Sequence, residues 1–236
     1  EITFRFLRAR KNDGFLNIIS IFSFIGISLG VAVLIIVMSV MNGFRTELIN
    51  KIVGFNPHIT VKPYNNKINP ARFYNPQLEF ISNNLISSNS GEAIILKKNI
   101  SKGIILRGYR ENDFSKLKII NNNLLIGNKD DLNEYNISIG KELSFTLNVD
   151  IGDKVTLMSP VGVETIIGTL PKQQTFTVVS LFESGLVDFD NNIAFINLET
   201  LEELFDLKVE DRNLEIYLKN PQNIETQKKI VQKIFP

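Results

Sequence analysis

The sequence has no cysteine, no tryptophan and a single histidine among its 236 residues. Without cysteine the chain can form no disulfide, so its stability has to come from a packed hydrophobic core. One histidine without any thiolate cannot assemble the usual zinc ligands, and we predict no metal site. An exported domain without cysteine is more typical of a bacterial periplasm than of a eukaryotic secretory compartment.

Charge is absent from one long stretch. Residues 14–44 contain no Asp, Glu, Lys or Arg, although 22% of the whole chain is charged. A helix needs about 20 apolar residues to cross the ~30 Å hydrocarbon layer of a membrane. A helix also satisfies its own backbone hydrogen bonds in lipid. We therefore predict a transmembrane helix at residues 17–44.

The charges that flank this helix predict its orientation. Four basic residues lie at positions 5–11, whereas only Arg45 and Lys51 follow closely, opposed by Glu47. The positive-inside rule then places residues 1–16 at the cytoplasmic side and residues 45–236 outside the cytoplasm. The competing interpretation, a cleaved signal peptide, expects a shorter apolar core and a cleavage site with small residues, and neither is present.

The outer segment has the pattern of a mixed domain. It has a net charge near −1, which provides no basic field for binding nucleic acid. Short strands and helices alternate along it, so we predict the α+β class, a mixed α/β periplasmic domain with an inserted β-rich subdomain at about 140–197. The expected strands are 55–62, 93–96, 103–107, 154–158, 175–182, 193–196 and 214–218. The expected helices are 76–86, 139–147, one capped by Asn197 and one that starts at Pro221.

No catalytic motif in the sequence has the context that its chemistry needs. The sequence GISLG at residues 26–30 matches the nucleophile elbow of serine hydrolases, but it lies within the predicted membrane helix, far from the lone His58. Glu202 and Glu203 are expected to be solvated, and no Walker A motif is present. We predict no catalytic residue and no bound cofactor in this chain.

Gly26 and Gly30 form a G-x-x-x-G motif, whose small residues allow two membrane helices to approach closely. We predict that they pack against a partner helix; the alternative is a single helix with incidental glycines.

A second feature is the loop of residues 160–171, with the sequence PVGVETIIGTLP. It is longer than a tight hairpin connection needs, and it exposes the apolar residues Val163, Ile166, Ile167 and Leu170. Such a tip is costly to leave in water, so one interpretation is a docking loop. The other is a further strand pair that folds back on the domain. The residues alone leave both open.

A set of short motifs lies along residues 4 to about 200: FLRAR at 6–10, DGF at 13–15, IIS at 18–20, GISLGV at 26–31, SVMNGFR-x-EL at 39–48, GF-x-PHI at 54–59, GKEL at 140–143, GD-x-V at 152–155, FTVV at 176–179 and FE-x-G at 182–185. Together these motifs resemble the LolC/LolE family of lipoprotein-releasing permeases. The N-terminal run carries the most specific similarity, and the later motifs are shared with macrolide-exporter and cell-division relatives.

The resemblance implies a non-catalytic permease subunit of an ABC transporter in the bacterial inner membrane. It would extract lipoproteins from that membrane and pass them to a LolA-like periplasmic chaperone, while a separate LolD-like ATPase binds ATP. Family permeases have four membrane helices, with this domain between the first and the second. They work in pairs, so the partner would be a LolE-like subunit or a copy of this chain.

The resemblance also implies two sites. The family's chaperone-binding hook falls here on the loop 160–171, with contacts from Pro160, Val163, Glu164, Ile166, Ile167, Gly168, Leu170 and Pro171. Walls of a lateral cavity for the acyl chains of the lipoprotein would come from Val37, Val40, Met41 and Phe44. Two other functions stay open: an efflux or cell-wall-regulating permease of the same superfamily, and a single-span sensor ectodomain.

Overall fold

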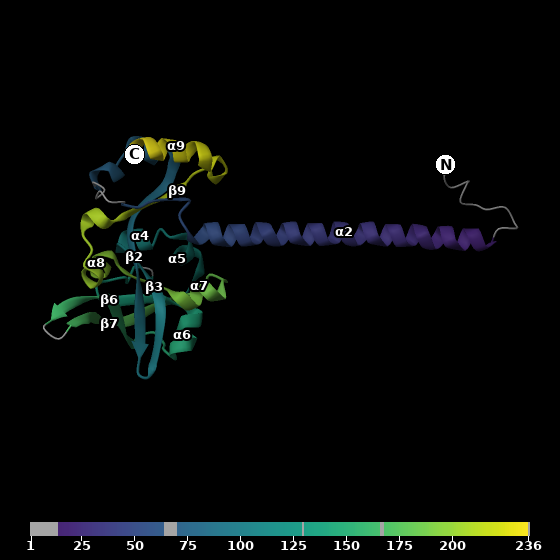
Figure 1. The fold of residues 1–236 in the computed structure, drawn as a ribbon. Helices are drawn as coiled ribbons and strands as arrows, with labels where there is room; N and C mark the ends of the chain where they lie inside the picture. The colour runs from purple at the N-terminus through teal and green to yellow at the C-terminus, as the bar shows by residue number, and fades with distance from the viewer. Residues whose placement is uncertain (1–13, 64–69, 129, 166–167, 236) are drawn as a thin grey trace. The chain divides into compact units, whose positions relative to one another are not determined.

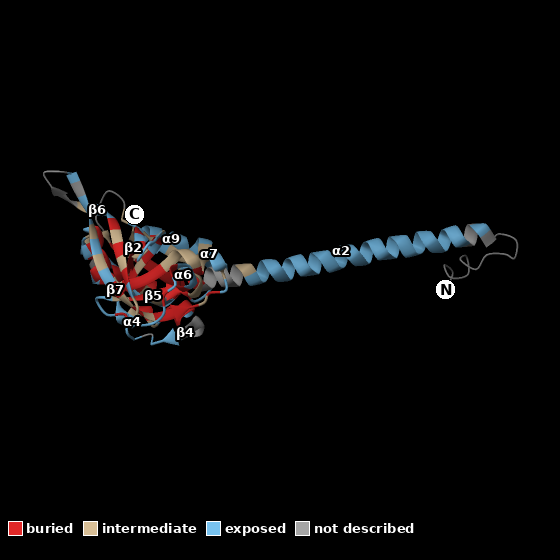
Figure 2. Cartoon of the chain, turned by 90° about the horizontal axis from the view of Figure 1, so that it is seen from below, coloured by how far each residue is buried: buried red, intermediate tan, exposed pale blue. Residues whose placement is uncertain are grey.

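The computed structural model describes residues 14–63, 70–128, 130–165 and 168–235. The chain divides at residue 50 into two compact units. Helix α2 (Gly14–Phe55) supplies the described part of the first unit. Among the described residues, positions 18–48 of α2 form the one stretch that is long and apolar enough to cross a membrane. The side chains described along this stretch are exposed or, at Leu48, half-buried (Figure 2).

Helix α2 continues beyond the predicted membrane segment 17–44, whose boundaries stay a prediction. It ends at Phe55, whose buried ring lies 5.5 Å from the ring of Phe189, centroid to centroid. Pro57 follows two residues later and disfavours a helical conformation at Asn56. The helix end is therefore set jointly by proline and by burial of an aromatic ring.

The second unit contains a mixed sheet of nine strands, which runs β1-β9-β2-β3-β8-β5-β7-β4, with β6 paired to both β2 and β7 (Figure 1). The pairs β3–β8 and β5–β7 are parallel, and the others are antiparallel. The strands are β1 (Ile59–Val61), β2 (Ser82–Lys97), β3 (Ile100–Tyr109), β4 (Leu124–Gly127), β5 (Asn136–Gly140), β6 (Lys154–Thr165), β7 (Gly168–Phe182), β8 (Ile193–Asn197) and β9 (Asn213–Leu218).

Six of these strands close on themselves. In the order β2-β3-β8-β5-β7-β6, each strand is hydrogen-bonded to the next, and β6 pairs back to β2. Closure removes the free edges that an open sheet presents. The largest buried cluster draws residues from all six strands, and Ile95, Leu157 and Val178 in it have no exposed surface. The ring of strands therefore encloses the main hydrophobic core.

Short helices cover the rest of the sheet. Helix α8 supplies Leu201, Leu204 and Phe205 to the main core. A separate cluster joins β1, β9, α3 and α9, with Leu78, Ile216 and Val231 buried. The helices of this unit are α3 (Pro76–Ile81), α4 (Glu111–Phe114), α5 (Lys118–Asn123), α6 (Lys141–Leu147), α7 (Val187–Asn192), α8 (Leu198–Phe205) and α9 (Ile224–Ile234). The α+β prediction, an N-terminal apolar helix followed by a mixed α/β domain, is confirmed.

The helix predicted for residues 76–86 is shorter than expected. Asn75 caps it as predicted, since its Oδ1 accepts a hydrogen bond from the Gln77 amide at 2.9 Å. The helix nevertheless ends at Ile81, and β2 starts at Ser82. The next residues are rich in Ser and Asn, which are poor helix formers, and pairing with β9 buries Ile86 in an extended strand. Tertiary pairing thus outweighs the helical spacing.

The helix predicted for residues 139–147 is divided between β5 and α6, with Gly140 at the junction. A side chain at Gly140 would overlap the carbonyl oxygen of Asp190, so the chain can pass there only with glycine. Strands β6, β7 and β8, from the stretch predicted as a β-rich subdomain, pair into the same sheet as β2, β3 and β5. The subdomain boundaries stay a prediction.

Candidate functional site

The loop predicted at residues 160–171 is instead the outer part of a long hairpin. Strands β6 and β7 pair antiparallel from Lys154 opposite Thr177 out to Thr165 opposite Gly168. Strand β6 also pairs with β2, but only through Thr156, Leu157 and Met158. We call residues 159–172, as far as the structure describes them, the outer hairpin. It reaches beyond the remainder of the sheet, and its described side chains are largely exposed (Figures 1 and 2).

A bulge separates the outer hairpin from its base. Met158 lies opposite Gln173, but the next pair is Gly162 opposite Pro171, so β6 carries two more residues than β7 here. Pro160 lies within this bulge, where its missing N–H breaks no ladder hydrogen bond. The buried Ser159 holds the bend, since its Oγ accepts a hydrogen bond from the Val161 amide at 3.1 Å. The bulge redirects the hairpin away from β2.

The ends of the outer hairpin are held in different ways. At its base, the Lys172 Nζ donates to the Glu203 carbonyl at 3.0 Å, near the C-terminal end of α8. A lysine there complements the unpaired carbonyls of a helix end. At the far end Gly168 has a φ of +120°, which side-chain-bearing residues rarely adopt. Glycine is therefore required at the turn.

The structure brings the described hook residues together on this hairpin. Pro160 and Pro171 are exposed, and Leu170 retains 53% of its surface. Backbone pairing sets Val163 opposite Leu170 and Glu164 opposite Thr169. Ile166 and Ile167 lie outside the described residues. The assignment of these residues to chaperone binding stays a prediction.

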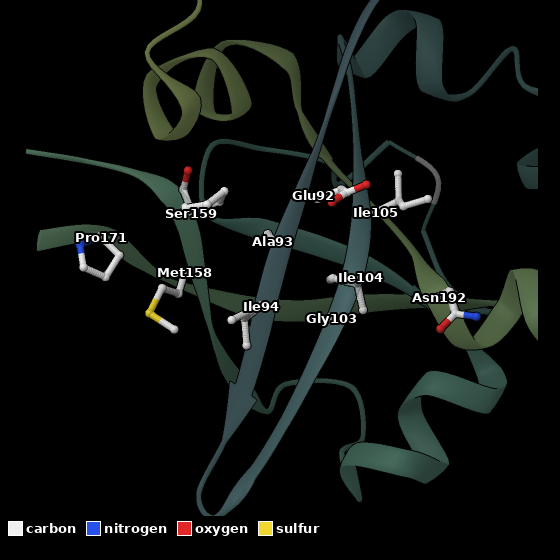
Figure 3. Close-up of a pocket in the computed structure, with 11 residues that line it drawn as sticks. Glu92, Ala93, Ile94, Gly103, Ile104, Ile105, Met158, Ser159, Pro171 and Asn192 are labelled. Atoms are coloured by element: carbon white, nitrogen blue, oxygen red, sulfur yellow. The ribbon is translucent and has the colours of Figure 1, made fainter. Parts of the chain in front are cut away.

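An apolar groove of about 700 Å³ lies at the base of the outer hairpin. Ile94 from β2 and Ile105 from β3 are about 40% exposed there, and Met158 from β6 lies beside Ile94 (Figure 3). Gly103 pairs with Ile94 and leaves open space where a side chain would stand. The lining residues are Glu92, Ala93, Ile94, Gly103, Ile104, Ile105, Met158, Ser159, Pro160, Pro171 and Asn192. Sequence reasoning missed this groove because β2 and β6 come together only in the folded sheet.

The groove follows from strand alternation. Ala93 and Ile95 point into the core. Their neighbours Glu92 and Ile94 therefore point outward, because side chains alternate along a strand. An apolar residue on an outward face leaves apolar surface in water, and pockets of this size and chemistry are typical of ligand or partner sites. The groove and the outer hairpin share Pro160 and Pro171, so the two form one continuous surface.

The proposed cavity residues of α2 share one helix face. Val37, Val40, Met41 and Phe44 have the spacing i, i+3, i+4 and i+7, and each is more than half exposed. Around Gly26 and Gly30 the described residues leave open space, since an added side-chain carbon would meet no atom within 4 Å. Both assignments, to an acyl-chain cavity and to helix packing, stay predictions.

A buried carboxylate near the end of α2 was not anticipated. Glu215 on β9 accepts hydrogen bonds from Ser88 Oγ at 2.7 Å, Tyr109 OH at 2.9 Å, Tyr217 OH at 3.0 Å and Arg107 Nη2 at 3.2 Å. Arg107 also donates to Asn56 Oδ1 at 3.4 Å. Burial raises the pKa of Tyr109 and of Tyr217, and the charge of Glu215 raises both further. The network joins β2, β3 and β9. The charge of Arg107 and the three hydroxyl donors stabilise the Glu215 carboxylate.

Glu202 was predicted to be solvated, and this is wrong. Its side chain is buried between α8 and the start of β9, where it forms an ion pair with Arg212. Asn89 Nδ2 on β2 also donates a hydrogen bond to the Glu202 carboxylate, at 3.1 Å. His58 is likewise a structural residue, since its Nδ1 accepts a hydrogen bond from the Leu218 amide at 3.0 Å. Within the described parts of the chain, no group of three or more His, Asp or Glu residues could hold a metal ion.

The second unit belongs to a known class of periplasmic domain. A family model described as the MacB-like periplasmic core domain matches residues 20–234, and the chain belongs to this family. It is also similar to the lipoprotein-releasing system transmembrane protein LolC of Neisseria meningitidis serogroup B, with 32% identity over 94% of this chain and 54% of that protein. LolE of Haemophilus influenzae is 29% identical over 66% of this chain and 39% of that protein.

A solved structure was also found, the periplasmic region of MacB from Actinobacillus actinomycetemcomitans. It has 12% identity and a TM-score of 0.46, and covers 74% of this chain and 75% of that chain. This chain spans about half the length of the curated relatives that it matches. The family and the apolar helix together indicate an inner-membrane protein with a periplasmic domain.

Proposed function

We propose that this chain is part of the permease subunit of an ABC transporter that extracts lipoproteins from the inner membrane. The observation that carries the proposal is the 32% identity to LolC along 94% of the chain. In the proposed cycle the permease has no catalytic residue or cofactor of its own, and a LolD-like ATPase binds ATP in the cytoplasm.

The structure suggests how the cargo would be handed over. The triacyl anchor of a lipoprotein is costly to expose, because each methylene group transferred to water costs about 0.8 kcal/mol. A LolA-like chaperone docked on the outer hairpin would sit beside the apolar groove, since Pro160 and Pro171 belong to both. Such an arrangement would keep the acyl chains shielded during transfer. The full-length subunit would be multi-pass and would pair with a LolE-like subunit or a copy of itself.

One substitution at the outer hairpin tests this proposal. Leu170→Ser removes an apolar side chain that is 53% exposed, and Ile126→Ser on β4 is the matched control, with 58% exposed. The full-length permease, assembled with its ATPase, would be tested for capture of the periplasmic chaperone and for lipoprotein release from proteoliposomes. We expect Leu170→Ser to weaken both and Ile126→Ser to weaken neither. Equal behaviour of the two variants would contradict the docking role.

The alternative is an efflux permease of the same superfamily, favoured by the MacB-like description of the family model. It predicts ATPase stimulation by a small hydrophobic substrate, without any effect of lipoprotein or chaperone. The same proteoliposomes distinguish the two functions, because lipoprotein release can be measured in them directly.

A further inference from the structure

A second apolar groove lies near the N-terminal end of β2, where α3 and α9 meet. It has a volume of about 440 Å³ and is lined by Pro76, Gln77, Phe80, Ile81, Ile230 and Lys233. Phe80 is 81% exposed, the highest value among the large apolar side chains described. The groove is separate from the surface formed by the outer hairpin, with which it shares no lining residue.

Positive charge gathers around this groove. Residues 219–235 contain four lysines and a single acidic residue, Glu225, whereas residues 45–218 contain 18 basic and 22 acidic residues. Lys229 and Lys233 are exposed and lie one turn apart on the same face of α9. The local charge is therefore opposite to that of the remaining domain.

A third lysine of this segment, Lys219, is held over the exposed ring of Phe80. The Lys219 Nζ lies 5.8 Å from the centroid of Phe80 and donates to the carbonyl oxygens of Phe80 at 2.9 Å and Glu79 at 3.2 Å. These carbonyls end helix α3, so the lysine both caps the helix and fixes a positive charge beside the aromatic ring. An exposed aromatic ring flanked by lysines and an apolar groove match an amphiphile with an anionic head.

We infer that the α3–α9 edge of the domain binds the surface of a bilayer that contains anionic phospholipid. Phe80 would enter the interface, the groove would take apolar chain segments, and Lys219, Lys229 and Lys233 would face the phosphates. Charge complementarity selects the lipid, because a polybasic surface is attracted to anionic head groups by an amount that grows with each lysine. The apolar helix α2, which is predicted to span the membrane, would hold this domain close to a bilayer.

This inference goes beyond the proposed function and is independent of the cargo. Residues 1–236 contain no cysteine, so a single label can be introduced in this part of the chain once any cysteine elsewhere in the full-length protein has been replaced by serine. An environment-sensitive fluorophore on Gln77→Cys reports the groove, and one on Ser101→Cys, at the start of β3 beside the turn from β2, is the control; both positions are exposed. The full-length protein is reconstituted in vesicles that carry nitroxide-labelled lipid, either of phosphatidylcholine alone or mixed with phosphatidylglycerol.

We expect lipid quenching of the label at residue 77, but not at residue 101, in the mixed vesicles. Raising the salt from about 0.1 M to about 1 M shortens the Debye length from ~10 to ~3 Å and should abolish it. Lys229→Gln with Lys233→Gln should weaken the contact roughly 30-fold, at about five-fold per lysine. Lys98→Gln with Lys154→Gln removes two exposed charges from the other end of β2 and should have no effect.

Three results would overturn the inference. Absence of quenching at residue 77 in mixed vesicles excludes lipid contact. Equal quenching at residue 101 shows that the whole domain approaches the bilayer without a preferred edge. A label at residue 77 that is shielded from water but unquenched by lipid, with or without phosphatidylglycerol, shows that a protein covers the groove. Circular dichroism of each variant establishes that it is folded, and lipoprotein release assays separate a failure here from a failure of the proposed function.

Discussion

Arg212 donates two parallel hydrogen bonds to Glu202, from Nε to Oε1 at 2.6 Å and from Nη2 to Oε2 at 2.7 Å. Both side chains are at least nine-tenths buried. Because Glu202 lies on α8 and Arg212 immediately precedes β9, the pair fastens a helix of the main core to the strand that carries the Glu215 network. A buried pair of this geometry is costly to break from one side, since the remaining charge stays in a dry site.

We therefore expect Arg212→Ala to lower the free energy of unfolding by about 3–5 kcal/mol. The control is Arg110→Ala, which breaks an exposed pair with Glu199 and should cost less than about 1 kcal/mol. Urea unfolding in detergent, followed by circular dichroism, measures both. A similar small loss for the two variants would show that water reaches Glu202.

The buried tyrosines predict a specific loss of stability in alkali. The pKa values of Tyr109 and Tyr217 are raised in the folded protein, mainly by burial, so the unfolded chain gives up these protons first. The stabilisation is complete below the ordinary tyrosine pKa of about 10 and falls as the pH rises above it. Each tyrosine contributes a slope of about 1.4 kcal/mol per pH unit.

The variant Tyr109→Phe with Tyr217→Phe should remove most of that slope. It should also be less stable than the native protein at neutral pH, because two donors to the buried Glu215 carboxylate are lost. Unfolding midpoints measured from pH 8 upward compare the two proteins. If the slopes were equal, these tyrosines would not be the groups that titrate.

Glycine at position 140 is required by close backbone packing. Gly140→Ala should cost at least about 1–3 kcal/mol, because the new carbon would overlap the Asp190 carbonyl. Gly103→Ala is the matched control in the same sheet, since its new carbon meets nothing within 4 Å. Thermal unfolding measures both, and a loss as large for Gly103 would mean that strand propensity, not the overlap, is responsible.

The glycines of α2 should affect association without affecting the fold. Gly26→Leu with Gly30→Leu adds side chains into open space in this chain, so we expect the domain to unfold at an unchanged temperature. If the glycines pack against a partner helix, resonance energy transfer between labelled permease subunits in a bilayer should fall several-fold. Leu29→Ile, on the same helix, serves as the control. Unchanged energy transfer in the glycine variant would contradict a role of Gly26 and Gly30 in helix packing.

Features determined by neighbouring residues were accessible from the sequence. The long apolar helix follows from composition, and the caps at Asn75 and Asn197 follow from side chains that accept amide hydrogen bonds in the first helical turn. The strands around Val155 and Val178 were placed correctly because their alternating apolar residues bury one face.

Features determined by distant residues were not accessible. The pairing of β6 with β2 joins residues about 60 positions apart, and both the closed ring and the apolar groove depend on it. The partner of Glu202 lies beyond the end of α8, so the carboxylate looked solvated from the helix alone. Pro160 and Pro171 suggested a loop, because the sequence does not reveal the bulge that accommodates proline in a strand.

Strands β6 and β7 form both the outer hairpin and part of the closed ring, with the bulge at residues 159–161 between the two parts. A lengthwise pull on the hairpin loads β6 and β7 together, so it is resisted in shear by the hydrogen bonds from β6 to β2 and from β7 to β5 and β4. A pull across the hairpin would instead open them one at a time. A partner that pulls lengthwise on the outer hairpin would therefore transmit its displacement to the closed ring of strands.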